Sequence, residues 1–232
     1  MAEKKPLRIL SALAVGLFIL CIPIFLLTTS LNWAVNEVRL YQYGFDKFAV
    51  SEATGIGDEE LLVVAREIIH YFNSKEEPIQ ITILTAEDEE LFNEREVAHL
   101  KDVKGLIGLC YNLQQATFGY LAAFAIGGFV WQRRRFAPSL AKMMLAGGAI
   151  TIVLLILVGI VSLVNFQWLF LGFHRLFFSG DSWILSGYLP QMFPPGFFYD
   201  AVLFIVGAIV VEALVIGGMG GFFVLRGRRA RS

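Results

Sequence analysis

Four apolar stretches, each long enough to cross a lipid bilayer, constrain this chain more than any other feature. They cover residues 7–29, 109–131, 145–164 and 201–224. A membrane-spanning helix needs about 20 consecutive, mostly apolar residues, and each stretch meets this requirement. Only 17% of the residues are charged, whereas soluble domains carry about 25%. The sequence therefore predicts an all-α membrane protein with four transmembrane helices.

Basic residues beside these stretches predict the orientation of the helices. Three groups occur, and each lies next to the start or end of an apolar stretch. They are Lys4, Lys5 and Arg8, then Arg133, Arg134, Arg135 and Lys142, and finally Arg226, Arg228, Arg229 and Arg231. Lys and Arg collect on the cytoplasmic side of membrane proteins, and all three groups share one side of a four-span chain. Both termini are therefore expected in the cytoplasm.

This orientation gives an expected domain organisation. Segments 30–108 and 165–200 are expected outside the membrane on the extracytoplasmic face, and residues 132–144 should form a basic cytoplasmic loop. The first span with its cytoplasmic start covers 1–29, and a basic cytoplasmic tail covers 225–232.

The first outer segment, 30–108, is expected to form a helical extracytoplasmic domain. It carries most of the chain's 20 acidic residues, and its apolar residues recur at helical spacing. Asp58, Glu59 and Glu60 favour a helix start, since acids are stabilised near the positive end of the helix dipole. Apolar residues then recur at helical spacing, at Leu61, Leu62, Ala65, Ile68, Ile69 and Phe72. A strand-like run follows at 79–83. A second helix is expected to begin near 86–90 and to include Leu91 and Phe92.

The second outer segment, 165–200, is dense in aromatic side chains and poor in charge, with Arg175 and Asp181 among its few charged groups. Solvated loops are rich instead in Gly, Pro, Asn, Asp and Ser. Pro190 and Pro194 argue against one continuous helix. We expect an aromatic loop that lies at the membrane interface or dips into the bilayer where protein covers its backbone.

Two of the three histidines, His99 and His174, lie beside the predicted spans on the expected outer face. On a helix, Glu96 and Asp102 would share a face with His99. Imidazole is the side chain best suited to proton transfer near neutral pH, and a neighbouring carboxylate fixes its tautomer. The pair could therefore act on a lipid at the membrane edge. Either residue could instead be an ordinary surface or interfacial histidine.

Other polar residues give weaker indications. His70, late in the first outer helix, is expected to be solvated, and Glu212 falls near the middle of the fourth span, where an acid is a candidate functional residue. Glu96 and His99 have the spacing of a carboxylate–histidine metal pair, but further ligands are lacking and no metal site is expected. No cofactor motif is present. The basic groups are explained by membrane orientation, so nucleic-acid binding is not expected.

Three segments of the chain, 92–106, 173–183 and 189–198, resemble the signatures of a family of bacterial membrane proteins. These are the lipoprotein intramolecular transacylases, which have four spans. The resemblance implies an acyltransferase of the bacterial plasma membrane whose partners are diacylglyceryl-modified lipoproteins and membrane lipid. It would move a fatty acyl chain from the glycerol sn-2 oxygen to the α-amine of the lipoprotein's N-terminal cysteine.

The resemblance also implies roles for the two histidines. His99 is expected to be the general base, and His174 the acid or the donor that stabilises the developing oxyanion. A variant mechanism has one histidine accept the acyl chain covalently. The residues expected to support the pair are Glu96, Asp102, Arg175, Asp181 and Trp183.

Two other functions are consistent with the residues alone. The protein could be a non-catalytic interaction or sensor protein that binds partners through its acidic outer domain. A transporter would need functional groups in mid-membrane, and Glu212 is the single acid there; without an internal repeat, this interpretation is the weakest of the three.

Overall fold

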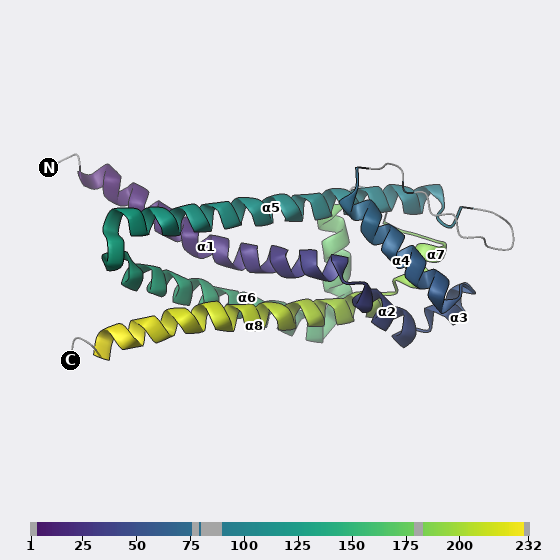
Figure 1. Ribbon diagram of the computed structural model, residues 1–232. Helices are drawn as coiled ribbons and strands as arrows, with labels where there is room; N and C mark the ends of the chain where they lie inside the picture. The colour runs from purple at the N-terminus through teal and green to yellow at the C-terminus, as the bar shows by residue number, and fades with distance from the viewer. Residues whose placement is uncertain (1–3, 76–78, 80–89, 179–182, 230–232) are drawn as a thin grey trace. The chain divides into compact units, whose positions relative to one another are not determined.

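The computed structural model of the protein describes residues 4–75, 79, 90–178 and 183–229, and every regular element in these ranges is a helix (Figure 1). The expected all-α fold is confirmed. The helices are α1 (Lys4–Asn36), α2 (Val38–Lys47), α3 (Val50–Thr54), α4 (Asp58–Asn73), α5 (Glu94–Gln132), the 3-10 turn η1 (Arg133–Phe136), α6 (Ala137–Phe177), α7 (Tyr188–Met192) and α8 (Pro195–Arg229). The strand-like run at 79–83 lies, apart from Ile79, outside the described residues.

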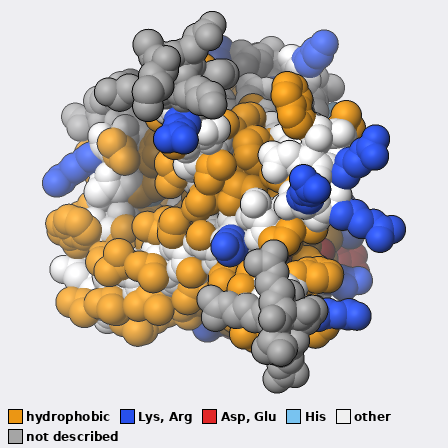
Figure 2. Space-filling view, turned by 90° about the vertical axis from the view of Figure 1, so that its left-hand side faces the viewer, with side chains coloured by type: hydrophobic (Ala, Val, Ile, Leu, Met, Phe, Trp, Pro, Cys, Tyr) orange, Lys and Arg blue, Asp and Glu red, His pale blue; other side chains and the backbone are white. Residues whose placement is uncertain are grey.

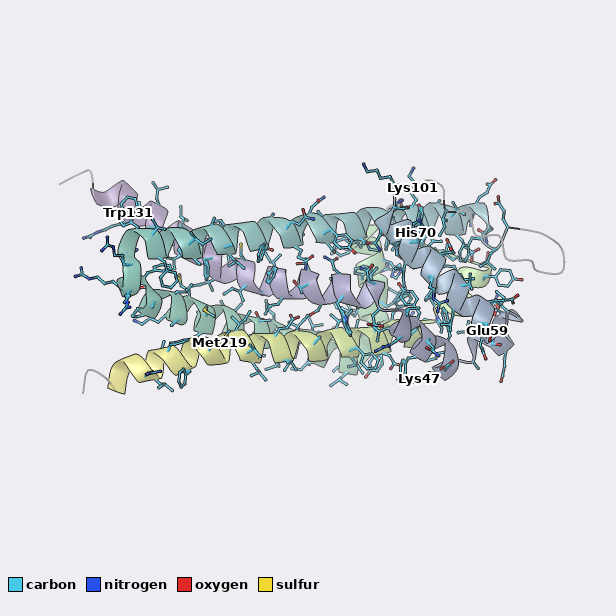
Figure 3. All side chains as sticks on the ribbon, viewed as in Figure 1. Lys47, Glu59, His70, Lys101, Trp131 and Met219 are labelled. Carbon is cyan, nitrogen blue, oxygen red and sulfur yellow. The ribbon has the colours of Figure 1, made fainter. Side chains whose placement is uncertain are left out.

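Three helical stretches are long and apolar enough, by length and composition, to cross a membrane: Arg8–Asn36, Glu94–Phe177 and Pro195–Arg226. The second of these contains both α5 and α6, joined by η1. Large apolar side chains along the helices are exposed, including Val130 at 76% and Trp131 at 90% (Figure 3). Helices that are apolar on all sides fit a lipid environment.

The chain divides into two compact units. Unit 1 contains Met1–Ser30, Tyr111–Gly159 and Val206–Ser232, and unit 2 contains Leu31–Cys110 and Ile160–Ile205. Each unit therefore combines segments that are far apart in the sequence.

In unit 1, the chain reverses direction at η1, so that the following part of α6 runs back along α5 (Figure 1). Arg133, Arg134 and Arg135 in η1, and Lys142 in α6, are exposed. Figure 2 shows Lys and Arg side chains standing out from a largely apolar surface. Arg133, Arg134 and Arg135 thus lie at one tight turn, whereas Lys142 lies within α6, so the expected basic loop 132–144 is largely helical.

Helices α6 and α8 approach each other closely in unit 1 through small residues. A Cβ atom added to Gly148 would lie 2.9 Å from the Cα atom of Gly217 and 3.0 Å from the carbonyl oxygen of Ala213. A Cβ atom at Gly220 would lie 2.5 Å from the carbonyl oxygen of Ala141. Small residues allow such backbone contact between membrane helices, where van der Waals packing drives association.

Partly buried polar side chains in unit 1 bond to one another across helices. Ser30 Oγ donates a hydrogen bond to Glu212 Oε2 at 3.2 Å, and Gln114 Nε2 donates one to Thr29 Oγ1 at 3.0 Å. Polar groups in apolar surroundings are costly unless they are hydrogen-bonded. Glu212 therefore has a structural partner, which its position in the sequence did not reveal.

Unit 2 has an apolar core built around α4. The acidic first turn expected at Asp58 is confirmed, and Glu60 Oε2 accepts a hydrogen bond from the Gly57 N–H at 3.3 Å. Figure 3 labels Glu59 and His70 at opposite ends of this helix, and His70 is exposed. The buried core residues are Tyr41, Phe45, Val50, Ile56, Leu61, Val64, Ala65, Ile68, Tyr71, Ile79, Leu91, Phe92, Leu100, Leu189 and Met192.

Helix α5 begins at Glu94, later than the expected start near 86–90. The reason is that Asn93 caps the helix, as its Oδ1 accepts a hydrogen bond from the Glu96 N–H at 3.1 Å. Leu91 and Phe92, expected on the helix, precede it and are buried in the core of unit 2.

The expectation of a loop over 165–200 is wrong for much of that segment. Helix α6 is interrupted at Asn165, whose φ and ψ are −158° and 81°, and then continues to Phe177. Its aromatic residues pack at a spacing of four, with ring centroids 6.1 Å apart for Phe166 and Phe170. That spacing stacks the rings on one helix face. The prolines do prevent one continuous helix, because α7 ends before Pro194 and α8 begins at Pro195.

Helix α2 is linked to the start of α8 within unit 2. Lys47 Nζ donates hydrogen bonds to Asp200 Oδ2 at 2.6 Å and to Tyr43 Oη at 3.1 Å; Figure 3 labels Lys47. The hydrogen bond to Asp200, with that to Tyr43, raises the pKa of Lys47. This contact fixes the first turns of α8 on the helical domain.

The glycine contact between α6 and α8 yields a stability prediction. Gly148→Ala should lower the free energy of unfolding in detergent by about 1–3 kcal/mol, because the added methyl group meets backbone atoms that cannot rotate away. Gly159→Ala is the matched control, since a Cβ atom there meets nothing within 4 Å. Thermal unfolding followed by circular dichroism measures both, and equal midpoints for the two variants would contradict the prediction.

Candidate active site

The first turn of α5 is fixed by reciprocal hydrogen bonds between Asn93 and Glu96. Asn93 Oδ1 accepts hydrogen bonds from the backbone N–H groups of Arg95 and Glu96, at 3.0 and 3.1 Å. Glu96 Oε2 accepts one in return from the Asn93 N–H at 3.0 Å. This is the reciprocal arrangement of a capping box. His99 follows Glu96 by three residues and lies on the same side of the helix.

The Glu96 side chain also reaches the segment before α7. It is fully buried, and its Oε1 accepts a hydrogen bond from the Leu189 N–H at 2.7 Å. Asn93 Nδ2 donates to the carbonyl oxygen of Ser186 at 2.7 Å. Two backbone N–H donors therefore satisfy the buried carboxylate, and the first turn of α5 is joined to residues 186–189.

The structure brings His99 and His174 together in unit 2. Their ring centroids are 6.2 Å apart, the planes differ by 18°, and each residue is only 8% exposed. Phe178 contacts both imidazoles, with centroid distances of 4.8 Å to His99 and 5.4 Å to His174. Two segments far apart in the sequence thus present a pair of imidazoles in one apolar environment.

A backbone hydrogen bond orients the His174 ring. Its Nδ1 lies 2.8 Å from the carbonyl oxygen of Phe170, one turn earlier in α6. Because a carbonyl oxygen only accepts, Nδ1 carries the hydrogen and the neutral ring keeps its lone pair on Nε2. The ring is also packed between Phe170, at 4.3 Å, and Trp183, at 5.2 Å. His174 is therefore held by its neighbours, and its Nε2 makes no hydrogen bond to the residues that the structure describes.

His99 is held differently. Its Nδ1 is buried and has no hydrogen-bond partner among the residues that the structure describes. The expected orienting role of Glu96 is not seen there, because the two Glu96 oxygens bond to Asn93 and Leu189. A buried imidazole nitrogen without a protein partner can accept or donate a bond to a bound molecule.

The remaining expected site residues differ in their placement. Trp183 contacts the His174 ring, whereas Arg175 on α6 and Asp102 on α5 are exposed. Asp181 lies outside the described residues. Of the supporting residues in the described ranges, Trp183 therefore contacts one ring of the pair, whereas Glu96 bonds to Asn93 and Leu189.

Sequence reasoning missed the backbone of Phe170 and the ring of Phe178 as parts of this site. The spacing of four between Phe170 and His174 would have indicated the first, had the segment been expected as a helix. Nothing in the local sequence indicates that the Leu189 N–H bonds to Glu96, since this contact joins distant segments.

The Phe170 hydrogen bond predicts the tautomer of His174. Nitrogen-15 NMR of histidine-labelled protein should show the neutral His174 ring protonated at Nδ1, because the carbonyl oxygen needs a donor there. The chemical shift of Nε2 should then be that of an unprotonated nitrogen. A His174→Ala variant assigns the signal, and a ring protonated at Nε2 alone would contradict the assignment.

Comparison with known proteins confirms the family resemblance that the histidine segments indicated. A model of the family described as lipoprotein intramolecular transacylase Lit matches residues 16–198 of the chain. The search of curated proteins found no match to this chain.

Solved structures of the membrane integral lipoprotein intramolecular transacylase Lit from Bacillus cereus share the fold. One is 20% identical, with a TM-score of 0.77 over 95% of this chain and 98% of that one. A second, with a histidine-to-arginine mutation, is 18% identical, with a TM-score of 0.78 over 99% and 100% of the two chains. A third, with a histidine-to-alanine mutation, is 18% identical, with a TM-score of 0.78 over 98% and 99%. Since the family match covers well over half of the chain, this protein belongs to the lipoprotein intramolecular transacylases, a family of bacterial membrane-bound acyltransferases.

Proposed function

We propose that this protein moves a fatty acyl chain within a diacylglyceryl-modified lipoprotein, and that His99 and His174 carry the proton transfers. The acyl chain would leave the sn-2 glycerol oxygen and end on the α-amine of the N-terminal cysteine. The observation that carries the proposal is the pair of buried imidazoles, 6.2 Å apart, in a chain of the transacylase family.

The reaction is the aminolysis of an ester. The amine nitrogen attacks the ester carbonyl carbon, a C–N bond forms, and the bond from that carbon to the glycerol oxygen breaks. One proton leaves the amine and one is given to the glycerol oxygen, so the products are an amide and a free hydroxyl group. An α-amine titrates at about 7.7–8.0 and an ordinary histidine at about 6.5, which allows efficient proton exchange between them.

The two rings suit complementary roles. His99 has a buried nitrogen without a partner in the described residues, and we assign it as the base that takes the proton from the amine. His174 has its Nδ1–H bonded to the Phe170 carbonyl, so its Nε2 can donate only when the ring is protonated. We assign the protonated ring as the acid that gives the Nε2 proton to the leaving oxygen or hydrogen-bonds to the oxyanion. Asp102, three residues after His99, is the carboxylate proposed to orient it. Arg175 and Asp181 are proposed to support His174.

The aromatic side chains around the pair contribute by excluding water. Phe170, Phe178 and Trp183 pack against the imidazoles, which are only 8% exposed. Water would compete with the amine for the ester carbonyl, and an environment that excludes it protects the acyl group from hydrolysis. Because donor and acceptor belong to one molecule, positioning would supply much of the rate enhancement.

We further propose that the chain crosses the bacterial plasma membrane four times, with both termini in the cytoplasm. The exposed basic residues of η1 and Lys142 support this orientation. Segment 30–108 and the residues around His174 would then face outward. This is the side on which the N-termini of mature lipoproteins lie.

The histidine mechanism is tested with His99→Ala and His174→Ala in cells that lack the native activity. Each substitution should lower formation of the N-acylated product by about 10²–10⁴-fold, the usual contribution of a positioned acid–base group. Mass spectrometry of lipoprotein N-terminal peptides measures the product. His70→Ala is the control, since His70 is exposed on α4. Normal product from both site variants would refute the histidine mechanism. Absence of product even with the unaltered protein would favour a non-catalytic protein that binds partners through its acidic outer domain.

Glu212 gives a prediction that separates acyl transfer from transport. Glu212→Gln should leave the transfer rate close to that of the unaltered protein, because the amide oxygen can still accept the hydrogen bond from Ser30. The same mass-spectrometric assay measures the rate. Complete loss of function in this variant, in protein with normal thermal stability, would indicate that the intramembrane carboxyl group takes part in function.

A further inference from the structure

We infer that Glu96 is a positioning residue, which holds residues 186–189 against the first turn of α5 and thereby sets the two imidazoles relative to each other. The inference rests on the proposed function for its effect on rate. The placement that it describes concerns unit 2 alone and can be tested without substrate.

Helix capping alone does not explain why the Glu96 carboxylate is buried. The residue is fully buried, and no ion pair includes it in the part of the chain that the structure describes. Burying a carboxylate is costly unless hydrogen bonds replace its water. A capping residue can remain at the surface and still bond to its own helix. The second oxygen of Glu96 instead accepts the Leu189 N–H at 2.7 Å, which is the shorter of its two hydrogen bonds.

The partner segment has a backbone conformation that allows this contact. Gly187 has a φ of +135°, which L side chains rarely adopt. A Cβ atom there would also lie 2.7 Å from Glu96 Oε1 and 2.8 Å from Asn93 Nδ2. Asn93 adds a second bond, from its Nδ2 to the Ser186 carbonyl oxygen at 2.7 Å. The glycine, the amide and the carboxylate therefore act together to dock the segment.

Both imidazoles depend on this docking. On α5, His99 is one turn beyond Glu96. On the other side, Trp183 lies three residues before Ser186, and its ring packs on His174 at 5.2 Å. Leu185 and Tyr188, which lie before and after Ser186 in the chain, pack against the core of unit 2. A change at Glu96 or Gly187 should therefore displace Trp183 and the His174 ring relative to His99, although neither residue touches the reacting atoms.

The activity test compares two variants with two matched controls. Glu96→Gln keeps the size of the side chain but places an NH₂ group against a backbone N–H donor, and Gly187→Ala keeps the helix cap but blocks the docking. Each should lower the transfer rate about tenfold or more, since a displacement of about 1 Å can cost about 100-fold. Glu94→Gln alters an exposed acid in the same turn, and Gly55→Ala alters a glycine with φ +73° and nothing within 4 Å. Both controls should keep the rate of the unaltered protein.

A second measurement follows the placement itself. The protein is prepared with Trp33, Trp131 and Trp168 replaced by Phe, so that Trp183 is the fluorescent tryptophan. The His174 ring, 5.2 Å from that of Trp183, should quench its fluorescence, and His174→Ala in the same background gives the unquenched emission. This quenching should be lost in Glu96→Gln and Gly187→Ala and retained in both controls, while circular dichroism shows unchanged helix content in all four.

Each result bears on the inference. Unchanged quenching in both variants, or unchanged transfer rates in both, would overturn it. Loss of activity in Glu96→Gln with full activity and quenching in Gly187→Ala would reduce Glu96 to a helix cap, which also overturns it. If the unaltered protein forms no N-acylated product, the proposed function fails, whereas the quenching measurement still decides the positioning role.

Discussion

The carboxylate of Glu96 is buried away from water, and backbone N–H groups rather than a basic side chain accommodate it. A buried carboxyl group limits the positions that its neighbouring segments can take. If one segment moved away, the hydrogen bond would be lost and an unsatisfied polar group would remain in an apolar core. One of its donors is the start of its own helix and the other is the start of α7. The relative position of these two segments is thus fixed by directional bonds, which apolar packing alone would leave adjustable.

The histidine pair also makes few hydrogen bonds to the protein. In the described residues, one nitrogen of His174 bonds to a backbone carbonyl, and Nδ1 of His99 has no protein partner. The rest of the environment is aromatic, with Phe178 in contact with both rings. Hydrogen bonds are stronger where water is excluded, so the few groups left available can act strongly on a bound ester and amine. The arrangement combines two demands of the proposed reaction, which are proton transfer and protection from water.

The sequence predicted the features that depend on local patterns. The helical fold followed from the apolar runs, and the start of α4 followed from Asp58 and the two acids after it. Prediction failed where distant residues decide the outcome. Leu91 and Phe92 have the spacing of a helix, but Asn93 caps α5 after them and the core of unit 2 buries them. The density of aromatics and prolines in 165–200 obscured a local helical pattern, in which Phe170 and His174 are one turn apart. The two histidines could be selected as candidates, whereas the bond between Glu96 and Leu189 could not.

The low identity to structures of the same fold, 18–20%, is consistent with this division between local and distant constraints. A side chain that faces lipid needs only to be apolar, so many residues serve equally well at an exposed position such as Val130. Other positions allow almost no choice. Gly148 cannot carry a Cβ atom without meeting the backbone of α8, and Gly187 has both a left-handed φ and the Glu96 carboxylate beside it. The specific sequence requirements of this fold therefore concentrate where backbones approach closely and where a buried polar atom needs a defined donor, and the proposed active site lies next to one of these places.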